Sequence, residues 1–203
     1  MPKKEHYHHG DLRATLVAEG LKQLESGGEA AISLRALAKS AGVSPNAPYR
    51  HFADKNSLMG VLAAEGFLRF ADCIVGSSVG PPKDALLNQG RAYLEFALGH
   101  PGLYRLMFSP YGYSLTSDSC QREAGRAFAS LVETATRAQS AGWKVSVPLA
   151  EAVLTYWSAL HGWAGLVGDH LIPPEVPSPS IDHWLEAFFE DTNENRNKSS
   201  EIP

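Results

Sequence analysis

The sequence predicts an all-α protein of about nine helices. Apolar residues recur at helical spacing over long stretches, and no strand-like alternation of useful length occurs. The Gly, Pro and Ser residues that end or cap helices also fall at intervals suited to helices. The length of 203 residues is enough for two modest domains, each with its own core.

The first half of the sequence predicts four helices. They cover residues 10–26, 33–41, 44–51 and 57–75. Ser33, Ser44 and Ser57 are the expected N-caps, because a serine hydroxyl can accept a hydrogen bond from a backbone N–H at a helix start. Glycines mark the expected helix ends at Gly27-Gly28, Gly42 and Gly76.

The second half predicts five more helices. They cover residues 83–99, 103–108, 118–140, 147–168 and 181–190, with Asp118 and Ser146 as caps of the third and fourth. The segment His100-Pro101-Gly102 separates the first two, and a Tyr-, Gly- and Ser-rich loop spans 109–117. A Pro-rich linker is expected at 173–179 and a disordered polar tail at 192–203.

The composition, 44% hydrophobic and 20% charged, is ordinary for a globular protein. No apolar run approaches the roughly 18 residues of a membrane span, and Met1 to His9 are polar. We therefore expect a cytoplasmic protein with no membrane partner. Cys73 and Cys120 lie far apart without metal-ligand spacing, which predicts buried thiols in a reducing compartment.

The charge is distributed unevenly along the chain. The net charge is −4 overall, but residues 1–60 hold eight Lys and Arg against six acidic residues, whereas the remainder holds ten against sixteen. A mildly basic head on an acidic body fits a protein of which only one end meets phosphates.

The most informative segment runs from Ser33 to Phe52 and predicts two short helices joined by a tight turn. Gly42 can take a positive φ at the turn, and Ala38 is small enough for the helices to approach closely. Their shared core is expected from Leu34, Leu37, Ala41, Val43 and Phe52. The N-terminal end of the second helix, the part that enters a major groove, would offer Asn46, Ala47, Tyr49 and Arg50.

The side chains of this segment suit DNA. Arg can donate a bidentate pair of hydrogen bonds to guanine, Tyr and Lys reach phosphates, and Ser33 at a helix start adds hydroxyl and backbone donors. The plain alternative is a surface helical hairpin whose Arg and Lys are solvated. The spacing of Ala38 and Gly42, followed by Tyr49-Arg50-His51-Phe52, favours DNA binding.

The segment from Gly42 to Leu58 resembles the signature of TetR-type transcriptional regulators. The opening Tyr7 to Arg13 resembles one branch of that family, and His100-Pro-Gly-Leu-Tyr104 and Trp157-Ser-Ala-Leu-His-Gly162 resemble its sensor domain. The resemblance implies a three-helix helix-turn-helix domain in 1–56 and an effector-sensing and dimerisation domain in 57–191. It also implies a homodimeric repressor that binds a palindromic operator and is released by a small apolar or amphipathic effector.

The resemblance also assigns DNA contacts residue by residue. Base or sugar contacts are expected from Arg35, Asn46, Ala47, Tyr49 and Arg50. Phosphate contacts are expected from Ser33, Ser44, His51 and Lys55. Pro48 departs from the branched aliphatic residue usual in the motif and lacks an N–H, which allows the recognition helix to start later than Ser44.

Large apolar and aromatic residues fill 60–140, and most are expected to be core. A helical sensor builds its pocket between helices from apolar walls and a few polar groups. Tyr104 lies shortly before the loop at 109–117 and Tyr111 near the start of that loop, and Trp157 and His161 share a helix face at i, i+4. These four are the candidates for effector contact.

Small residues in 147–168 predict a dimer interface, because glycines within a helix cost about 1 kcal/mol each relative to Ala and so favour a packing role. Gly162 and Gly165 are its candidates there, joined by Trp184 and Phe188 of the amphipathic last helix. The alternative is that both helices simply close the monomer core. Two recognition helices per palindromic site favour the dimer.

Two other classes of protein compete with this interpretation. An enzyme is not expected, because the sequence has no nucleophile elbow, phosphate-binding glycine loop or paired metal-ligand motif. An architectural DNA binder would be strongly basic throughout, unlike this acidic body. His6, His8 and His9 suggest a basic arm on the DNA backbone rather than a metal site, so neither metal nor cofactor is expected.

Overall fold

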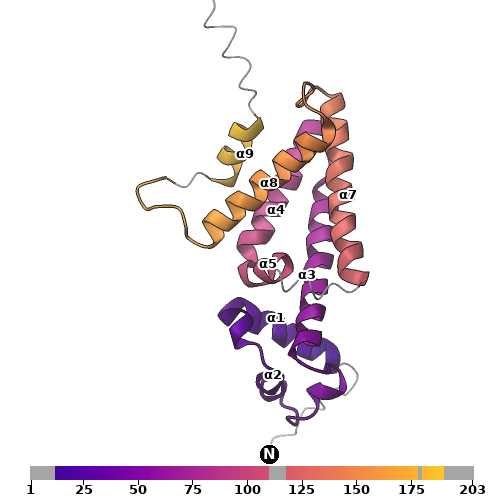
Figure 1. Cartoon of the computed structure of the whole chain (residues 1–203), viewed down its shortest axis with the longest axis vertical. Helices are drawn as coiled ribbons and strands as arrows, with labels where there is room; N and C mark the ends of the chain where they lie inside the picture. Colours follow the sequence, from indigo (N-terminus) through magenta and orange to yellow (C-terminus); the bar gives the residue numbers. More distant parts are fainter. Residues whose placement is uncertain (1–11, 110–117, 178–179, 190–203) are drawn as a thin grey trace, which may run out of the picture. The chain divides into compact units, whose positions relative to one another are not determined.

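A computed structural model describes residues 12–109, 118–177 and 180–189. These residues form eight α-helices and one 3-10 helix, η1, and include no strand (Figure 1), which confirms the predicted all-α class. In chain order the helices are α1 (Leu12–Ala31), α2 (Leu34–Ser40), η1 (Pro48–Arg50), α3 (Lys55–Ser77), α4 (Pro82–Gly99), α5 (Pro101–Phe108), α7 (Asp118–Ser140), α8 (Leu149–Gly168) and α9 (Ile181–Phe189).

Contacts divide the described residues into two compact units. Unit 1 holds those up to Arg69 and those from His100 to Ala124, and unit 2 holds Phe70 to Gly99 and everything from Gly125 onward. Helices α3 and α7 each contribute to both units. The functional division expected between residues 56 and 57 stays a prediction, and the expected tail at 192–203 lies outside the described residues.

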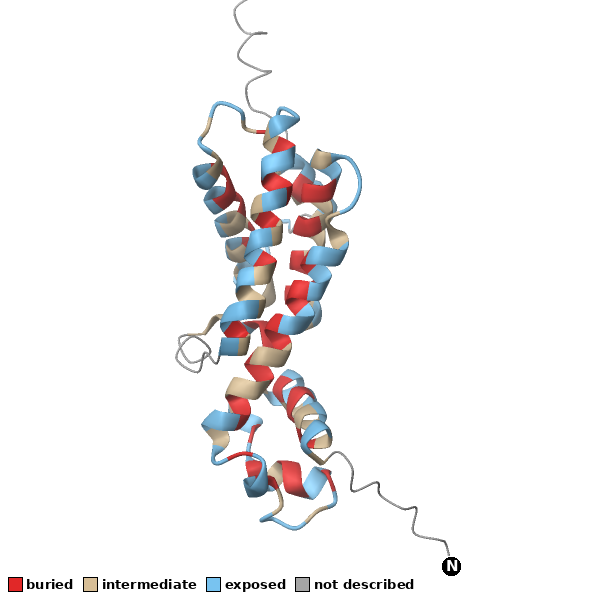
Figure 2. Cartoon of the chain, turned by 90° about the vertical axis from the view of Figure 1, so that its right-hand side faces the viewer, coloured by how far each residue is buried: buried red, intermediate tan, exposed pale blue. Residues whose placement is uncertain are grey.

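The core of unit 1 joins α1, α2, η1 and the first half of α3. Leu16, Leu37, Phe52 and Leu58 are each no more than 2% exposed. The helices show buried and exposed residues on opposite faces (Figure 2), as amphipathic helices around a small core should. The expected core of the 33–52 segment is therefore confirmed for Leu34, Leu37, Ala41 and Phe52, whereas Val43 is only half-buried.

Helix α5 is attached to α1 at its N-terminal end. The Glu25 carboxylate accepts hydrogen bonds from the backbone N–H groups of Gly102, at 2.9 Å, and Leu103, at 3.1 Å. A side chain at Gly102 would place its Cβ 2.5 Å from the Leu24 carbonyl oxygen, so only glycine fits there. The carboxylate satisfies N–H groups that have no partner inside α5.

The core of unit 2 brings α4, α8 and α9 together. Tyr156 of α8 is fully buried, and its hydroxyl donates to the Leu86 carbonyl at 3.0 Å. Burial raises the pKa of this phenol far above its usual value, so it stays protonated. Phe188 and Phe189 of α9 lie against the Tyr156 ring, each with ring centroids 5.4 Å away. Helix α9 thus closes the core of its own unit.

The structure corrects four predicted helix starts, one of which is that of α5, which begins at Pro101 and not at residue 103. Residues 44–47 form a turn rather than an α-helix, because Pro48 has no N–H to donate to the Ser44 carbonyl. Helix α3 begins at Lys55 and not at Ser57, since Asp54 and Ser57 cap it reciprocally. Helix α8 begins after Pro148, without a cap from Ser146.

The predicted end of the first helix is a kink. Helix α1 continues to Ala31, but Gly28 interrupts its helical backbone with a φ of 64°. None of the helices in the described residues is long and apolar enough to span a membrane.

Candidate nucleic-acid interface and sensor residues

The turn between α2 and η1 is built as the sequence predicts. The Ser33 hydroxyl accepts a hydrogen bond from the Ala36 N–H at 3.1 Å and caps α2. Gly42 has a φ of 66°, and the Val43 N–H donates to the Ala38 carbonyl at 3.0 Å, which ends the helix. Ala38 itself is 1% exposed.

A hollow on the surface of unit 1 gathers side chains from α2 and the segment that follows it. Its lining residues are Arg35, Ala38, Lys39, Val43, Pro45, Asn46 and Tyr49. The structure thus brings together Arg35, Asn46 and Tyr49, three of the residues predicted to contact DNA. We call this hollow and its rim the α2–η1 surface.

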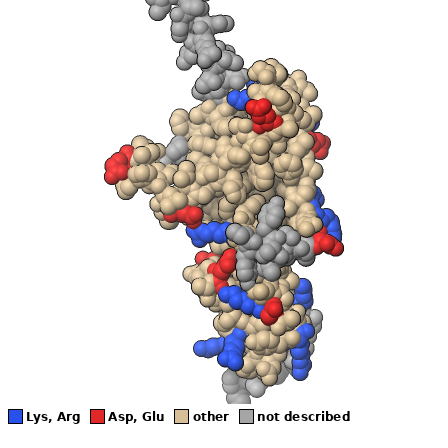
Figure 3. All heavy atoms as spheres, in the orientation of Figure 1, with Lys and Arg blue, Asp and Glu red and all other residues tan. Residues whose placement is uncertain are grey.

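Lys39 is a member of this surface that the DNA contacts assigned by resemblance left out. It is exposed and lies on α2 one turn after Arg35. The signal was present in the sequence, because residues at i and i+4 share one helix face. Figure 3 shows blue Lys and Arg atoms at the lowest part of the visible face, which belongs to unit 1.

Six predicted contacts lie outside the lining of the hollow: Ser33, which caps α2, Lys55, and four residues of the segment 44–51. Ser44, Arg50 and His51 are exposed and able to meet an external partner, whereas Ala47 is half-buried. Arg50 belongs to η1, whose single turn ends with the His51 N–H donating to the Pro48 carbonyl at 2.9 Å. The recognition element is therefore shorter than the predicted helix 44–51.

Lys55 has a structural partner. Its side chain is half-buried, and its ammonium donates to the Glu29 carbonyl at 2.6 Å, just past the kink in α1. An ammonium has three N–H donors, so this bond leaves donors that a phosphate oxygen can accept from.

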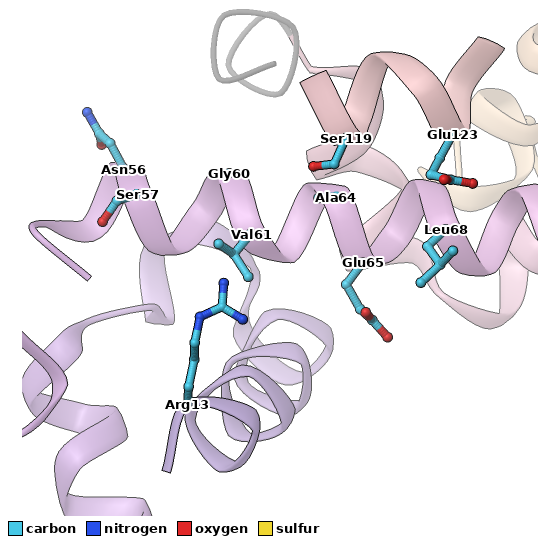
Figure 4. A pocket seen from close by; sticks show the side chains of 10 residues that line it. All are labelled: Arg13, Asn56, Ser57, Gly60, Val61, Ala64, Glu65, Leu68, Ser119 and Glu123. Atoms are coloured by element: carbon cyan, nitrogen blue, oxygen red, sulfur yellow. The ribbon is translucent and has the colours of Figure 1, made fainter. Parts of the chain in front are cut away.

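A second hollow in unit 1 lies along α3 between Arg13 of α1 and the first turns of α7 (Figure 4). In Figure 4 the Arg13 guanidinium points towards Val61, and Ser119 and Glu123 project from α7 over the same helix. The Arg13 guanidinium carbon also lies 5.8 Å from the centroid of the Phe52 ring. Arg13 thereby covers the helix-turn-helix core, and none of the predicted site residues lines this hollow.

Trp157 and His161, two of the predicted effector contacts, meet other helices of unit 2. The Tyr93 hydroxyl lies 2.8 Å from His161 Nδ1, and the Trp157 ring packs edge-on against Phe128 with centroids 5.6 Å apart. Burial lowers the pKa of His161 below its usual 6.5. The contacts of Tyr93 and Phe128 were missed because they join helices far apart in the sequence.

The other two predicted effector contacts are not joined to these. Tyr104 belongs to unit 1, where it is 8% exposed and packs against Phe108 with ring centroids 4.8 Å apart. Tyr111 lies outside the described residues, as do the histidines His6, His8 and His9.

The predicted interface residues fall into two groups. Trp184 and Phe188 pack inside unit 2, with Trp184 on Trp163 at 5.7 Å between ring centroids. Gly162 is exposed and Gly165 half-buried on α8. Trp184 and Phe188 thus pack within unit 2 but stay half-buried, and Gly162 lies on an outward face of α8, so the predicted dimer interface stays a prediction.

Comparison with known sequences identifies the family. Residues 16–62 match the family described as "Bacterial regulatory proteins, tetR family". Residues 86–188, just over half of the chain, match "Tetracyclin repressor-like, C-terminal domain". A comparison with curated protein sequences gives no match.

Solved structures share the fold over most of their length. A protein of unknown function from Rhodococcus sp. RHA1 is 30% identical, with a TM-score of 0.75 over 92% of this chain and 96% of that one. The TetR family transcriptional regulator PfmR from Thermus thermophilus is 21% identical, with a TM-score of 0.59 over 86% and 94%. AibR, solved with isovaleryl coenzyme A and operator DNA, is 13% identical, with a TM-score of 0.62 over 88% and 95%.

The helix-turn-helix and the all-helical domain that follows it in the chain define a DNA-binding transcriptional regulator. The chain belongs to the TetR family.

Proposed function

We propose that this chain is a transcriptional repressor that binds a palindromic operator as a homodimer and leaves it when a small apolar or amphipathic effector binds. The observation that carries the proposal is the α2–η1 surface, where Arg35, Lys39, Asn46 and Tyr49 converge on one hollow. Guanidinium, amide and phenol groups are the donors and acceptors that read base edges and hold phosphates.

Each predicted DNA contact has a part in this proposal. Arg35 and Arg50 read bases, with Asn46, Ala47 and Tyr49 beside them in the groove. Ser33, Ser44, His51 and Lys55 hold phosphates and set the register of the protein on DNA. All of these except Ala47 and Lys55 are exposed, which supports contact with an external partner.

A homodimer is supported by the outward face of α8. Every fourth residue along it is exposed and uncharged: Leu154, Ser158, Gly162 and Leu166. Leu154 is 57% exposed and Leu166 is 49% exposed. Small and apolar residues along an i, i+4 ridge allow a second α8 to pack closely across a twofold axis. Most of the visible face of unit 2 in Figure 3 carries no charged atoms.

The effector site in this proposal contains Trp157 and His161, and Tyr104 and Tyr111 remain candidates. The Trp157 to Gly162 segment is the reason for assigning the chain to one branch of the family. The protein would act in the cytoplasm, where its DNA is. AibR, solved with an acyl coenzyme A and operator DNA, supports a regulator that answers to a small molecule.

The effector can act only through a difference in its affinity for two arrangements of the protein. In one, the two recognition elements of the dimer lie about 34 Å apart, one DNA turn, and fit successive major grooves. In the other arrangement the two recognition elements do not fit successive major grooves. Helix α3 is the expected connection, because it contributes residues to both units.

Fluorescence anisotropy on the DNA upstream of the gene for this chain, across a salt series and against unrelated DNA, tests the proposal. Tight, salt-dependent and selective binding at two chains per site is expected. Arg35→Ala and Arg50→Ala should each weaken specific binding by about 1–3 kcal/mol. Lys22→Ala is the matched control, because Lys22 is an exposed cation of unit 1 paired with Glu19 and outside the α2–η1 surface.

Lys39→Ala and Lys55→Ala should behave differently from the arginine variants. Loss of a phosphate contact weakens binding to every sequence alike and lowers the salt dependence by about one released ion. Equal binding to both DNAs by the native protein would remove sequence-specific recognition from the proposal, and no binding at low salt would remove DNA altogether.

A further inference from the structure

Gln89 of α4 is a buried amide with one half unpaired. It is 2% exposed, and its Nε2 donates to the Ile74 carbonyl at 3.2 Å and to the Ser130 hydroxyl at 2.9 Å. A backbone carbonyl can only accept, so the amide cannot be turned the other way. Its Oε1 is therefore left buried without a hydrogen-bond partner. Buried polar atoms are nearly always paired, so this acceptor needs an explanation.

The next turn of α4 carries a second polar group on the same face. Tyr93 is 4% exposed, and its hydroxyl lies 2.8 Å from His161 Nδ1. Phe70 of α3 packs edge-on against Tyr93 at 5.1 Å and against Phe96 at 5.3 Å between ring centroids. Gln89 and Tyr93 thus place two polar groups on successive turns of α4, and the rings of Phe70 and Phe96 lie beside the second of them.

These contacts link four helices of unit 2 in a closed ring. Helix α3 meets α4 through Phe70, α4 meets α8 through the Tyr93–His161 pair, and α8 meets α7 through Trp157 and Phe128. Gln89 of α4 completes the ring, because its amide donates to the Ser130 hydroxyl of α7 and to the Ile74 carbonyl of α3. We call these residues the α4 ring: Phe70, Ile74, Gln89, Tyr93, Phe96, Phe128, Ser130, Trp157 and His161.

The α4 ring contains no Lys, Arg, Asp or Glu, and burial lowers the pKa of its one histidine, which disfavours the charged imidazolium. Two ion pairs of the same unit, Arg126 with Asp72 and Arg91 with Asp182, are formed by exposed side chains. A charged ligand placed among the ring residues would lose its hydration without gaining a counter-charge, which is costly.

We propose that the α4 ring is the effector site, and that it takes an uncharged aromatic molecule whose single O–H or N–H group donates a hydrogen bond to Gln89 Oε1. The inference rests on the proposed function, since it names the ligand class of its effector site. A donor on the ligand completes the pairing of the amide, and the aromatic side chains supply the contact area.

Isothermal titration calorimetry of the full chain without DNA tests this with 2-naphthol and its methyl ether, 2-methoxynaphthalene, which lacks the donor. The native protein should bind 2-naphthol about ten- to a hundred-fold more tightly, because the ether leaves the acceptor unpaired. Gln89→Met should abolish this preference. Gln139→Met should keep it, because Gln139 uses its amide on the Lys144 and Val147 carbonyls away from the α4 ring.

Equal affinity for the two compounds, binding of neither, or a preference that survives in Gln89→Met would overturn the proposal. If Gln89→Met does not fold, the NMR signals of the Gln89 side-chain amide in the native protein serve instead, and must shift with 2-naphthol and not with the ether. DNA binding is measured separately, so that a failure of the effector proposal can be distinguished from a failure of the proposed function. A protein that binds its operator but neither compound remains a regulator without this effector class.

Discussion

Two surfaces of this molecule differ in the side chains that they expose to water. The α2–η1 surface exposes the polar side chains of Arg35, Lys39 and Asn46 to water. The outward face of α8 exposes Leu154 and Leu166. Water solvates the first surface well, so its exposure costs little and stability alone does not require a partner. The second keeps apolar area in water, which a partner would remove at a gain of about 25 cal/mol per Å².

The two surfaces are recognised by different features. The polar surface is recognised by which donors converge, since a solvated charge run is common on any protein. The α8 face is recognised by what is missing from it, because four successive exposed positions on one ridge carry no charge. Changes to the first should alter DNA binding and leave stability intact. Changes to the outward face of α8 should alter dimer formation.

The largest effect is expected at the core beneath the α2–η1 surface. Phe52→Ala should lower the free energy of unfolding by about 3–5 kcal/mol, because the ring is 2% exposed and its removal leaves a cavity. Tyr49→Ala, at a side chain 50% exposed, should change it by less than about 0.5 kcal/mol and weaken DNA binding instead. Urea unfolding followed by circular dichroism measures both. A comparable loss in the two variants would show that Tyr49 belongs to the core.

The next effect is expected on α8. Replacing Leu154 and Leu166 together by Glu should convert a dimer to single chains, because like charges would face each other across the twofold axis at a cost of about 3 kcal/mol or more. Light scattering gives the molar mass. Leu171→Glu is the control, since Leu171 is 63% exposed but lies beyond the end of α8. A variant that stays dimeric would place the interface elsewhere.

Local signals in the sequence were enough to predict the helix-turn-helix. Ser33 caps α2 through its own hydroxyl, and Gly42 takes a positive φ, because both effects involve residues within a few positions. The same local reasoning failed at Ser44. A serine in a suitable place did not make a cap, because Pro48 four residues later cannot donate the hydrogen bond that would continue the helix.

Contacts between distant helices could not be read from the sequence. Glu25 meets the start of α5 at Gly102 and Leu103, 77 and 78 residues away, and Tyr93 meets His161 across 68 residues. Apolar periodicity predicts which face of a helix is buried but not which helix covers it. For the same reason the sequence did not predict that Trp184 packs on Trp163 and Phe188 on Tyr156 within unit 2.

Ser33 and Ser44 should differ by a smaller amount in their contribution to the free energy of unfolding. Ser33→Ala should lower the free energy of unfolding by about 1 kcal/mol, since the Ala36 N–H would lose its partner. Ser44→Ala should change it by less than about 0.5 kcal/mol, because the Ser44 carbonyl, which the variant keeps, makes the turn bond to the Ala47 N–H. Both are measured by urea unfolding at one protein concentration. Equal losses would restore Ser44 as a cap.

The smallest effect is a dependence on pH that belongs to unit 2. Burial lowers the pKa of His161 in the folded protein below its usual 6.5. Below pH 6.5 the unfolded chain therefore binds a proton that the folded protein resists, and stability falls as the pH drops from 6.5 through the lowered folded value. Above pH 6.5 the imidazole is neutral in both states, so the contribution disappears.

His161→Gln should accordingly reduce the loss of stability between about pH 7 and pH 5, followed by urea unfolding at each pH. His183→Gln, at an exposed histidine of α9, should keep the native slope. Because the Tyr93 hydroxyl lies against His161 Nδ1, a variant that removes the imidazole also changes this contact, so the slope with pH and not the absolute stability is the readout. A native slope in His161→Gln would mean that the imidazole is protonated as readily in the folded protein as in the unfolded chain.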